Sequence, residues 1–335
     1  MKKRLSGILS AFGMLVLILD AKTAITGAKE GIELCLMTII PSLFPFFVLS
    51  ILLTTNLSGA RSKFLRPIGR LCKMPEGSES LLLIGLLGGY PTGAQAVTQT
   101  YESGFLGKEQ AQRLLGFCSN AGPAFLFGIC GSLFPEKWIV WMLWAVHILS
   151  ALAVAIVMPG ETDDRLTCST ASHISLPQAL DRALKTAARV CGWVVLFRIV
   201  IAFSEKWILR QTGTVWKVLL FGLLELTNGC CQLSCIENIG LRFLLASLFL
   251  AFGGICVTMQ TVSVTASLGI GTYVRGKLLQ TVFSILLSLL LQAILFTDGW
   301  KIHANPILLM IPACYLLFVL IKYEKKSSIP ARSLV

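Results

Sequence analysis

The sequence predicts an all-α polytopic membrane protein, with about eight transmembrane helices and two re-entrant hairpins in two inverted repeats. Three observations lead to this fold class. Of the 335 residues, 55% are hydrophobic and only 14% are charged, and the mean hydropathy is +0.77. Several apolar stretches reach the ~20 residues that a helix needs to cross a bilayer. In addition, two apolar segments, 81–100 and 218–234, are broken in their middle by Gly, Pro, Thr or Asn.

The formal net charge of +12 comes from Lys and Arg in short loops between apolar runs. This is the positive-inside pattern of membrane proteins, so no nucleic-acid partner is predicted. The eleven Cys are scattered and the three His are isolated, and no CxxC motif occurs, so neither a metal site nor a cofactor is predicted. The chain also lacks a phosphate-binding loop and a nucleophile motif, so we expect neither an enzyme nor an ATP-driven transporter.

Residues 1–31 are predicted to hold the first transmembrane helix, at about 5–20. Three basic residues, Lys2 to Arg4, precede this apolar run and place the N-terminus in the cytoplasm. No convincing cleavage site follows, so we interpret the segment as an uncleaved span.

Residues 32–158 form the first predicted repeat. A span at about 32–53, kinked by Pro41 and Pro45, leads into a basic cytoplasmic loop at 61–73. Segment 81–100 follows as a hairpin that opens to the cytoplasm, and two spans at about 113–133 and 138–157 complete the repeat. Residues 159–185 are predicted as a cytoplasmic linker, in which the basic stretch 176–189 begins an amphipathic helix at the inner surface.

Residues 186–297 form the second predicted repeat. It contains a span at about 188–203, a hairpin at 218–236 that opens to the exterior, and spans at about 241–260 and 278–297. Arg275 and Lys277 are interpreted as markers of the cytoplasmic side. Residues 298–335 hold a last span, at about 306–321, and a basic cytoplasmic tail. The two hairpin segments share Gly-Leu-Leu, at Gly85 and Gly222, and a Gln at the same distance beyond it, at 95 and 232.

The hairpin tips are the first candidates for a substrate site. A helix broken at membrane depth leaves free N–H groups and carbonyls that can bind a solute. The polar side chains at the tips are Thr92 and Gln95 in the first hairpin and Glu225, Thr227, Asn228 and Gln232 in the second. Glu225 stands out, because an acidic residue at membrane depth is costly unless it is paired, protonated or hydrated, and it is therefore a candidate functional residue. The alternatives are a first tip whose glycines serve close packing, and a second hairpin so shallow that Glu225 meets water.

Two further candidate groups lie in interrupted spans. Ser119 and Asn120 precede Pro123, which should open the helix, and Thr258 and Gln260 follow the pair Gly253-Gly254. The alternative is that these small residues serve helix packing. Across both repeats, the predicted substrate-binding residues are Thr92, Gln95, Ser119, Asn120, Glu225, Thr227, Asn228, Gln232, Thr258 and Gln260.

Five motifs of this chain resemble those of the sporulation integral membrane protein YlbJ (SpoVV) family, with its nucleoside-recognition (Gate) domain. They are Ile-Pro-Ser-Leu-Phe-Pro at 40–45, Gly-Gly-Tyr-Pro-Thr-Gly at 88–93, Cys-Ser-Asn-Ala-Gly-Pro at 118–123, Glu-Leu-Thr-Asn-Gly at 225–229 and Phe-Gly-Gly at 252–254. The resemblance implies a fold similar to the concentrative nucleoside transporters. It also implies a role in spore formation, with dipicolinic acid as the proposed cargo.

We therefore expect a secondary transporter that moves a small organic anion by alternating access between two re-entrant hairpins. A nucleoside or other polar-solute carrier, and a non-transporting scaffold or assembly factor in sporulation, are the alternatives. The expected partners are the anionic substrate, the lipid bilayer and another copy of the chain in a homo-oligomer, and the coupling ion is H⁺ or Na⁺. The expected location is the bacterial cytoplasmic membrane or the outer forespore membrane.

Overall fold

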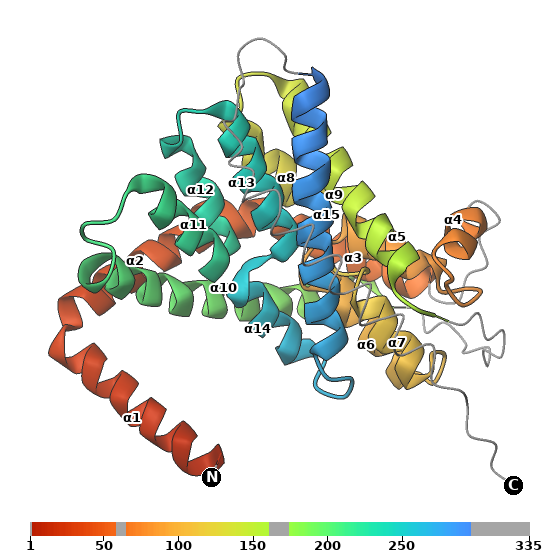
Figure 1. Cartoon of the computed structure of the whole chain (residues 1–335). Helices are drawn as coiled ribbons and strands as arrows, with labels where there is room; N and C mark the ends of the chain where they lie inside the picture. The colour runs from red at the N-terminus through yellow and green to blue at the C-terminus, as the bar shows by residue number, and fades with distance from the viewer. Residues whose placement is uncertain (1, 58–64, 161–173, 296–335) are drawn as a thin grey trace, which may run out of the picture.

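All regular elements that the structure describes are helices (Figure 1). The computed structural model describes residues 2–57, 65–160 and 174–295. Five stretches in these residues are long and apolar enough to cross a membrane: Ala21–Leu52, Lys137–Val157, Leu176–Trp207, Ile239–Val264 and Gly271–Ala293. The prediction of an all-α polytopic membrane protein is confirmed. The number of about eight spans stays a prediction, and the span at 306–321 lies outside the described residues.

The span predicted at 32–53 is part of a longer apolar stretch that begins at Ala21. Helix α1 (Lys2–Leu19) extends away from the other helices (Figure 1), and α2 (Ala21–Leu34) then continues through a π-helical turn (Cys35–Ile39) into α3 (Ile40–Leu57). The N–H of Ile40 bonds to the carbonyl of Cys35, five residues back. Pro41, the next residue, has no N–H to offer, which favours such a local widening beside it. The predicted boundary between residues 31 and 32 therefore falls inside a continuous helix.

Apart from the short helix α4 and the 3-10 turns, the two halves share the order of a long helix, a hairpin, an interrupted helix and a last helix. The first half has the short helix α4 (Arg66–Leu71), the hairpin α5 (Glu79–Leu87) and α6 (Thr92–Glu102), the interrupted helix α7 (Lys108–Leu115) and α8 (Pro123–Gly128), a 3-10 turn (Cys130–Leu133) and α9 (Lys137–Val157). The second half has α10 (Leu176–Trp207), the hairpin α11 (Thr214–Leu224) and α12 (Leu226–Gln232), a 3-10 turn (Leu233–Cys235), the interrupted helix α13 (Ile239–Phe252) and α14 (Gly254–Val264), and α15 (Gly271–Leu295). That the two halves have opposite orientations in the membrane stays a prediction.

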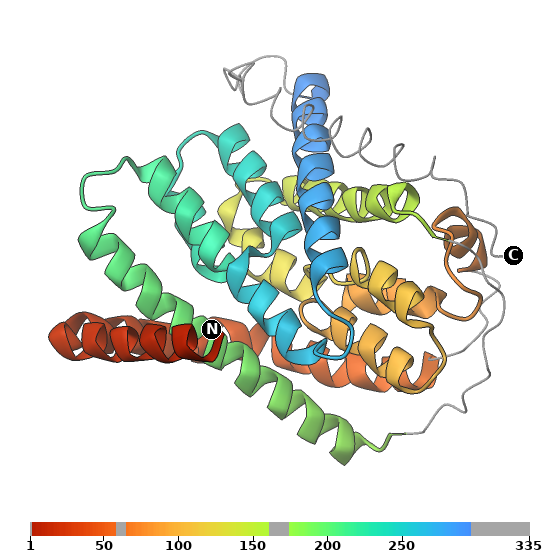
Figure 2. The same ribbon diagram turned by 60° about the horizontal axis from the view of Figure 1, so that its bottom comes forward.

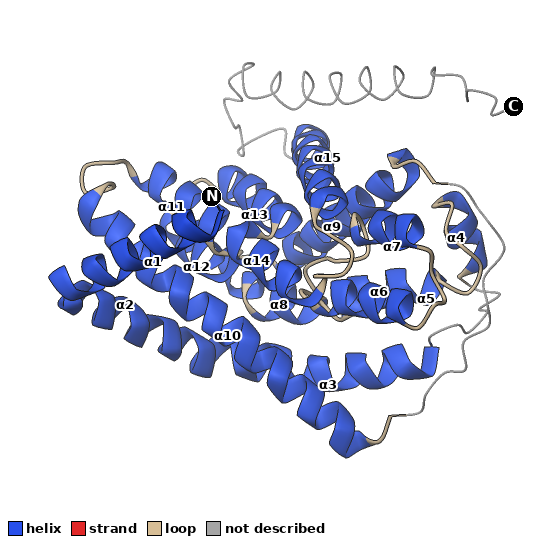
Figure 3. Ribbon diagram, turned by 90° about the horizontal axis from the view of Figure 1, so that it is seen from below, coloured by secondary structure: helices blue, strands red, loops and turns tan. Residues whose placement is uncertain are grey.

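Helix α10 differs from the prediction of a separate amphipathic helix at the membrane surface. It is continuous from Leu176 to Trp207, so residues 176–185, predicted as linker, belong to it. Ala179 and Ala183 are buried, while Leu180 and Leu184 on the other face are exposed. Helix α10 packs along α2 and α3 and forms one side of the molecule (Figure 3). The first turns of α10 thus pack one face against other helices, and their Lys and Arg side chains are exposed.

Ion pairs join α2 to α10 near one end of both helices. Arg198 of α10 pairs with Glu30 of α2 and, at 3.4 Å, with Glu205 of its own helix. Lys206 pairs with Asp20 at 2.6 Å. Gly27 of α2 allows close approach here, because a Cβ at this position would lie 2.9 Å from the Cβ of Ala202. These contacts make α2 and α10 one packed pair of helices.

The core is divided among three main clusters of buried apolar side chains. One surrounds the first hairpin, one fills the space between α9, the second hairpin and α13, and one joins α3 to α10. Helix α15 lies beside α13 and α9 (Figure 2). Large apolar side chains cover much of the exterior, for example Trp141, Leu196 and Leu290. Such an apolar exterior suits contact with lipid.

The buried Arg113 of α7 joins segments that are distant in the sequence. Its guanidinium donates to the carbonyls of Cys72 at 2.6 Å and Lys73 at 3.0 Å, and to those of Ala155 at 2.8 Å and Met158 at 3.3 Å. The last two are carbonyls at the C-terminal end of α9, which lack partners within that helix. Arg113 therefore caps α9 and holds the segment before the first hairpin against it.

Replacing Arg113 with Met is expected to destabilise the protein by about 2 kcal/mol or more, because buried carbonyls lose a charged donor. The measurement is the midpoint of thermal unfolding of the purified protein in detergent. Arg189→Met is the matched control, because Arg189 is exposed on α10. Equal midpoints for the two variants would contradict the capping role.

Candidate functional site

The first hairpin turns at the tip that the sequence analysis identified. Helix α5 ends at Leu87, Gly89 has a φ of +75°, the Tyr90–Pro91 peptide bond is cis, and α6 begins at Thr92. A positive φ is strained for residues with a Cβ, so Gly is suited to position 89. The backbone of α5 also passes close to that of α6, because a Cβ on Gly93 would lie 2.8 Å from the Cα of Gly85. The tip is therefore closely packed as well as polar.

The predicted third span is an interrupted helix. Between α7 and α8 the chain leaves the helix from Gly116 to Gly122, and Pro123 occupies the first turn of α8. The carbonyl of Cys118 lies against the first hairpin, 2.0 Å from where a Cβ on Gly85 or Gly93 would be. The predicted opening before Pro123 is present.

The second hairpin turns at Glu225, which is extended with φ −144° and ψ 120° and is 1% exposed. One carboxylate oxygen accepts from the N–H of Thr227 at 3.0 Å. The other accepts from the N–H and from the Nδ2 of Asn228, each at 2.7 Å. Glu225 is therefore the N-cap of α12, and three donors offset its charge.

The second interrupted helix breaks at Gly253 and Gly254, whose φ values are +79° and +78°. A Cβ on Gly253 would lie 3.3 Å from the Tyr90 ring, and one on Gly254 would lie 3.1 Å from the carbonyl oxygen of Gly222. This break thus lies against the first hairpin tip on one side and the second hairpin on the other. These two glycines interrupt the helix in addition to allowing close packing.

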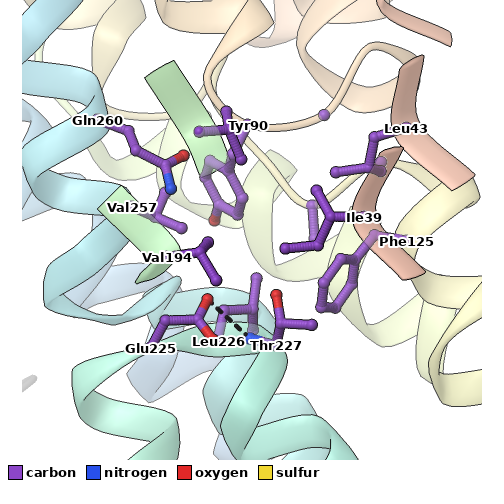
Figure 4. A pocket seen from close by; sticks show the side chains of 14 residues that line it. Ile39, Leu43, Tyr90, Phe125, Val194, Glu225, Leu226, Thr227, Val257 and Gln260 are labelled. Carbon is purple, nitrogen blue, oxygen red and sulfur yellow. Dashed lines mark hydrogen bonds between the residues drawn. The ribbon is translucent and has the colours of Figure 1, made fainter. Parts of the chain in front are cut away.

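A small cavity lies among these breaks (Figure 4). Tyr90 of the first tip and the residues Glu225 to Thr227 of the second point into it from different sides, and Val257 and Gln260 of α14 line it (Figure 4). Its other lining residues come from the helices around the tips: Ile39, Leu43, Gly89, Ala121, Gly122, Phe125, Val190 and Val194. Its volume is about 40 Å³, room for a few water molecules. The two hairpin tips therefore share one cavity, which is too small in this structure for an aromatic solute.

The predicted site residues fall into three groups. Glu225, Thr227 and Gln260 line the cavity. Others are packed close to the breaks: Thr92, Ser119, Asn120, Asn228 and Thr258. Gln95 is half-buried on α6, Gln232 is exposed on α12, and neither is among the lining residues.

The side chains of the second group differ in their hydrogen bonds. The hydroxyl oxygens of Thr92 and Ser119 are buried and have no hydrogen-bond partner among the described residues. The hydroxyl of Thr258 donates to the carbonyl of Gly254, at 3.1 Å. Asn120 donates to the carbonyl of Phe117 at 2.7 Å, which shapes the interrupted segment. Asn120 also accepts from Lys277 and Gln280 of α15. Its position next to the cavity is therefore determined by bonds to its own segment and to α15.

Sequence reasoning missed a buried polar group beside the cavity, centred on Lys277. Lys277 was expected at the cytoplasmic side before a span at 278–297, but α15 begins at Gly271 and Lys277 is 1% exposed. Its ammonium donates to Tyr90 Oη at 3.0 Å, to Asn120 Oδ1 at 3.4 Å and to Gln280 Oε1 at 2.6 Å. The one available signal was that Lys277 and Gln280 are three residues apart in an apolar helix, which places them on one face.

His147 of α9 completes this group. Its Nε2 accepts from the N–H of Ala121 at 3.1 Å, and its carbonyl accepts from Gln280 Nε2 at 3.5 Å. The group thus connects the first tip, the first break, α9 and α15. Among the described residues, no three His, Cys, Asp or Glu side chains come together in a way that could hold a metal ion.

The helices and their apolar exterior define an integral membrane protein with several spans and a cavity among broken helices. The chain is similar to the sporulation integral membrane protein YlbJ of Bacillus subtilis (strain 168). The two are 24% identical over 320 aligned positions, which cover 81% of this chain and 78% of that protein. This similarity supports the resemblance to the YlbJ family. No family model matches the chain, and no solved structure matches it.

Proposed function

We propose that the protein is a secondary transporter that moves a small organic anion by alternating access at the cavity between the two hairpin tips. The observation that carries this proposal is that both hairpin tips, the first helix break and α14 line one cavity. Discontinuous helices around a shared site are the arrangement that secondary transporters use to bind a solute within the membrane. Because the cavity holds only a few waters, the tips must move apart to admit a solute, as alternating access requires.

Two features favour an anion as the solute. Helices α6 and α14 both begin beside Tyr90, and helix starts carry free N–H groups and a partial positive charge. The Lys277 ammonium is bonded to the hydroxyl of Tyr90, which lines the cavity. The Glu225 carboxylate opposes an anion, but its three hydrogen bonds already offset its charge.

Dipicolinic acid and a role in sporulation are our candidates for cargo and process. The similar Bacillus subtilis protein carries sporulation in its name, and the family resemblance implies this small aromatic dianion as the cargo. A nucleoside or other polar solute is the second candidate, since Gln260 and Thr227 offer neutral hydrogen-bonding groups in the cavity. A scaffold or assembly factor has no evident use for a cavity of this kind.

Uptake of labelled dipicolinate and labelled uridine into proteoliposomes tests the proposal, with Gln260→Ala and Gln232→Ala as a matched pair. Gln260 lines the cavity and is 5% exposed, whereas Gln232 is exposed on α12. Losing a hydrogen bond worth about 0.5–1.5 kcal/mol should slow uptake about 2- to 13-fold in Gln260→Ala, with no change in Gln232→Ala. Uptake of uridine but not dipicolinate would favour the nucleoside carrier. No uptake of either solute by folded protein would favour the scaffold.

A further inference from the structure

One face of α15 carries a line of buried polar side chains through an otherwise apolar helix. We call this line the polar file; it consists of Lys277, Gln280, Ser284, Ser288 and Gln292. The first four are at most 1% exposed and the last is 7% exposed. Steps of three or four residues keep them on one face. At 1.5 Å per residue the file is about 22 Å long, a large part of the ~30 Å hydrocarbon core of a bilayer.

The polar file faces the inside of the helix bundle. Ser284 Oγ donates to the carbonyl of Ser247 on α13 at 3.1 Å, and Ser288 Oγ donates to the carbonyl of Ser284 at 2.7 Å. At the other end, Gln280 Nε2 donates to Asn120 Oδ1 at 2.9 Å. The opposite face of α15 is apolar and exposed, as Leu290 shows with 57% exposure. The file therefore leads from the group around Lys277 along α13 and α9, away from lipid.

Three neutral acceptors surround the Lys277 ammonium. Within 4 Å, no carboxylate of the described residues pairs with it. The titratable groups that face it are Tyr90, Tyr273, Cys118 and His147. The arginines of the helices packed against α15 are held elsewhere: Arg113 on α7 and Arg242 on α13 both bond to backbone carbonyls.

A buried lysine with no counter-ion is costly while it is charged. Unlike arginine, lysine can release its proton when it is buried. Lys277 can therefore gain or lose its proton as the charge in the cavity changes. Tyr90, which lines the cavity, links Lys277 to it.

Polar atoms beside and along the file lack partners. Both amide atoms of Gln292, the Oγ of Ser247 and the Nδ1 of His147 are buried and have no hydrogen-bond partner in the described part of the chain. Buried polar atoms of this kind are satisfied by water. Serines that only join helices would need no such water, because their bonds to neighbouring helices suffice. Water between Gln280, Ser284, Ser288 and Gln292 would make the file continuous for a proton.

We propose that Lys277 is the proton-carrying group of the transporter, and that the polar file is its water-lined route to the side of the membrane where α15 ends. This inference rests on the proposed transport function. In the step itself one N–H bond of the ammonium breaks, the electron pair stays on nitrogen, and the proton passes to water in the file. When an anion enters the cavity, the amine takes up a proton and offsets one unit of its negative charge. The proton and the anion then cross together.

The first test compares wild type with Lys277→Gln in proteoliposomes, using labelled dipicolinate as the probe. Exchange of internal for external dipicolinate needs no net proton movement, while accumulation driven by an imposed pH gradient does. We expect Lys277→Gln to lose at least tenfold more of the accumulation driven by the gradient than of the exchange, because exchange uses the anion site but needs no proton. Accumulation equal to wild type would overturn the role of Lys277, and so would equal losses of exchange and accumulation in folded protein.

The second test measures whether water reaches the polar file, and it needs no transport. Ser288→Cys and Leu290→Cys are compared in a background with Cys231 and Cys235, both exposed, replaced by Ser. Each variant is treated with a membrane-impermeant cationic thiosulfonate. A water-lined file makes Ser288→Cys react at least tenfold faster than the outward-facing Leu290→Cys, and equal rates would overturn it. If Ser288→Cys reacts but dipicolinate never enters the vesicles, the proposed cargo fails while the file stands.

Discussion

Glu225→Gln is expected to lower dipicolinate uptake by tenfold or more while the protein still inserts in the membrane. The carboxylate accepts hydrogen bonds from the backbone N–H groups of Thr227 and Asn228 and from the side chain of Asn228. A Gln side chain has one acceptor oxygen, so its NH₂ group would face a donor. Loss of a hydrogen bond to a buried charged group costs about 1.5–3 kcal/mol, and 1.4 kcal/mol is a factor of ten. The second tip would then lose its shape at the cavity.

The measurement is initial uptake by equal amounts of folded protein, and Glu237→Gln is the matched control. Glu237 is exposed between α12 and α13, so the same chemical change should leave uptake within about twofold of wild type there. If Glu225→Gln transports as fast as Glu237→Gln, Glu225 does not determine the geometry of the site.

Gly93→Ala is expected to prevent correct packing of the first hairpin. A Cβ at this position would lie 2.0 Å from the carbonyl oxygen of Cys118 and 2.8 Å from the Cα of Gly85. Both atoms are backbone, so relief requires the hairpin to move away from the interrupted helix. Overpacking of this kind costs about 1–3 kcal/mol or more, and the cavity between the tips would change with it.

The measurements are the yield of monodisperse protein in detergent and the midpoint of its thermal unfolding, with Gly192→Ala as the control. Gly192 is exposed in α10 and has no neighbour within 4 Å of a Cβ. Replacing a helical Gly with Ala there should stabilise the protein by about 0.5–1 kcal/mol. An unfolding midpoint for Gly93→Ala at or above that of wild type would mean that the close crossing at Gly85 and Gly93 is wrong.

The broken helices were predictable because their signals are local. Glycine and proline at 88–93, 118–123 and 252–254 disfavour a helix, and each of these stretches is interrupted in the structure. The second hairpin breaks at Glu225 instead, and Asn228 and Gly229 lie inside α12. That these breaks lie around one cavity could be predicted only with the hypothesis of an inverted repeat. The opposite orientations in the membrane, the nucleoside-recognition domain and the likeness to nucleoside transporters remain predictions.

Lys277 was missed because its partners are distant in the sequence. Tyr90 and Asn120 lie 187 and 157 residues from it, and no local pattern brings them together. A Lys beside an Arg next to an apolar run also fits the positive-inside pattern, which gave a sufficient explanation for both. The separate helix predicted at 176–189 is instead the first part of α10, because its Lys and Arg do not prevent another face from packing on α2 and α3. Its placement at the inner membrane surface stays a prediction.

Modification of Thr227→Cys in oriented vesicles is the most direct test of alternating access at the cavity. Thr227 lines the cavity at the second tip and is 4% exposed in this closed arrangement. A membrane-impermeant thiol reagent should modify the new cysteine from each side of the membrane in turn, and saturating dipicolinate should slow the reaction from both sides. Modification from one side alone, or rates unaffected by dipicolinate and uridine, would contradict a transport site between the two hairpins.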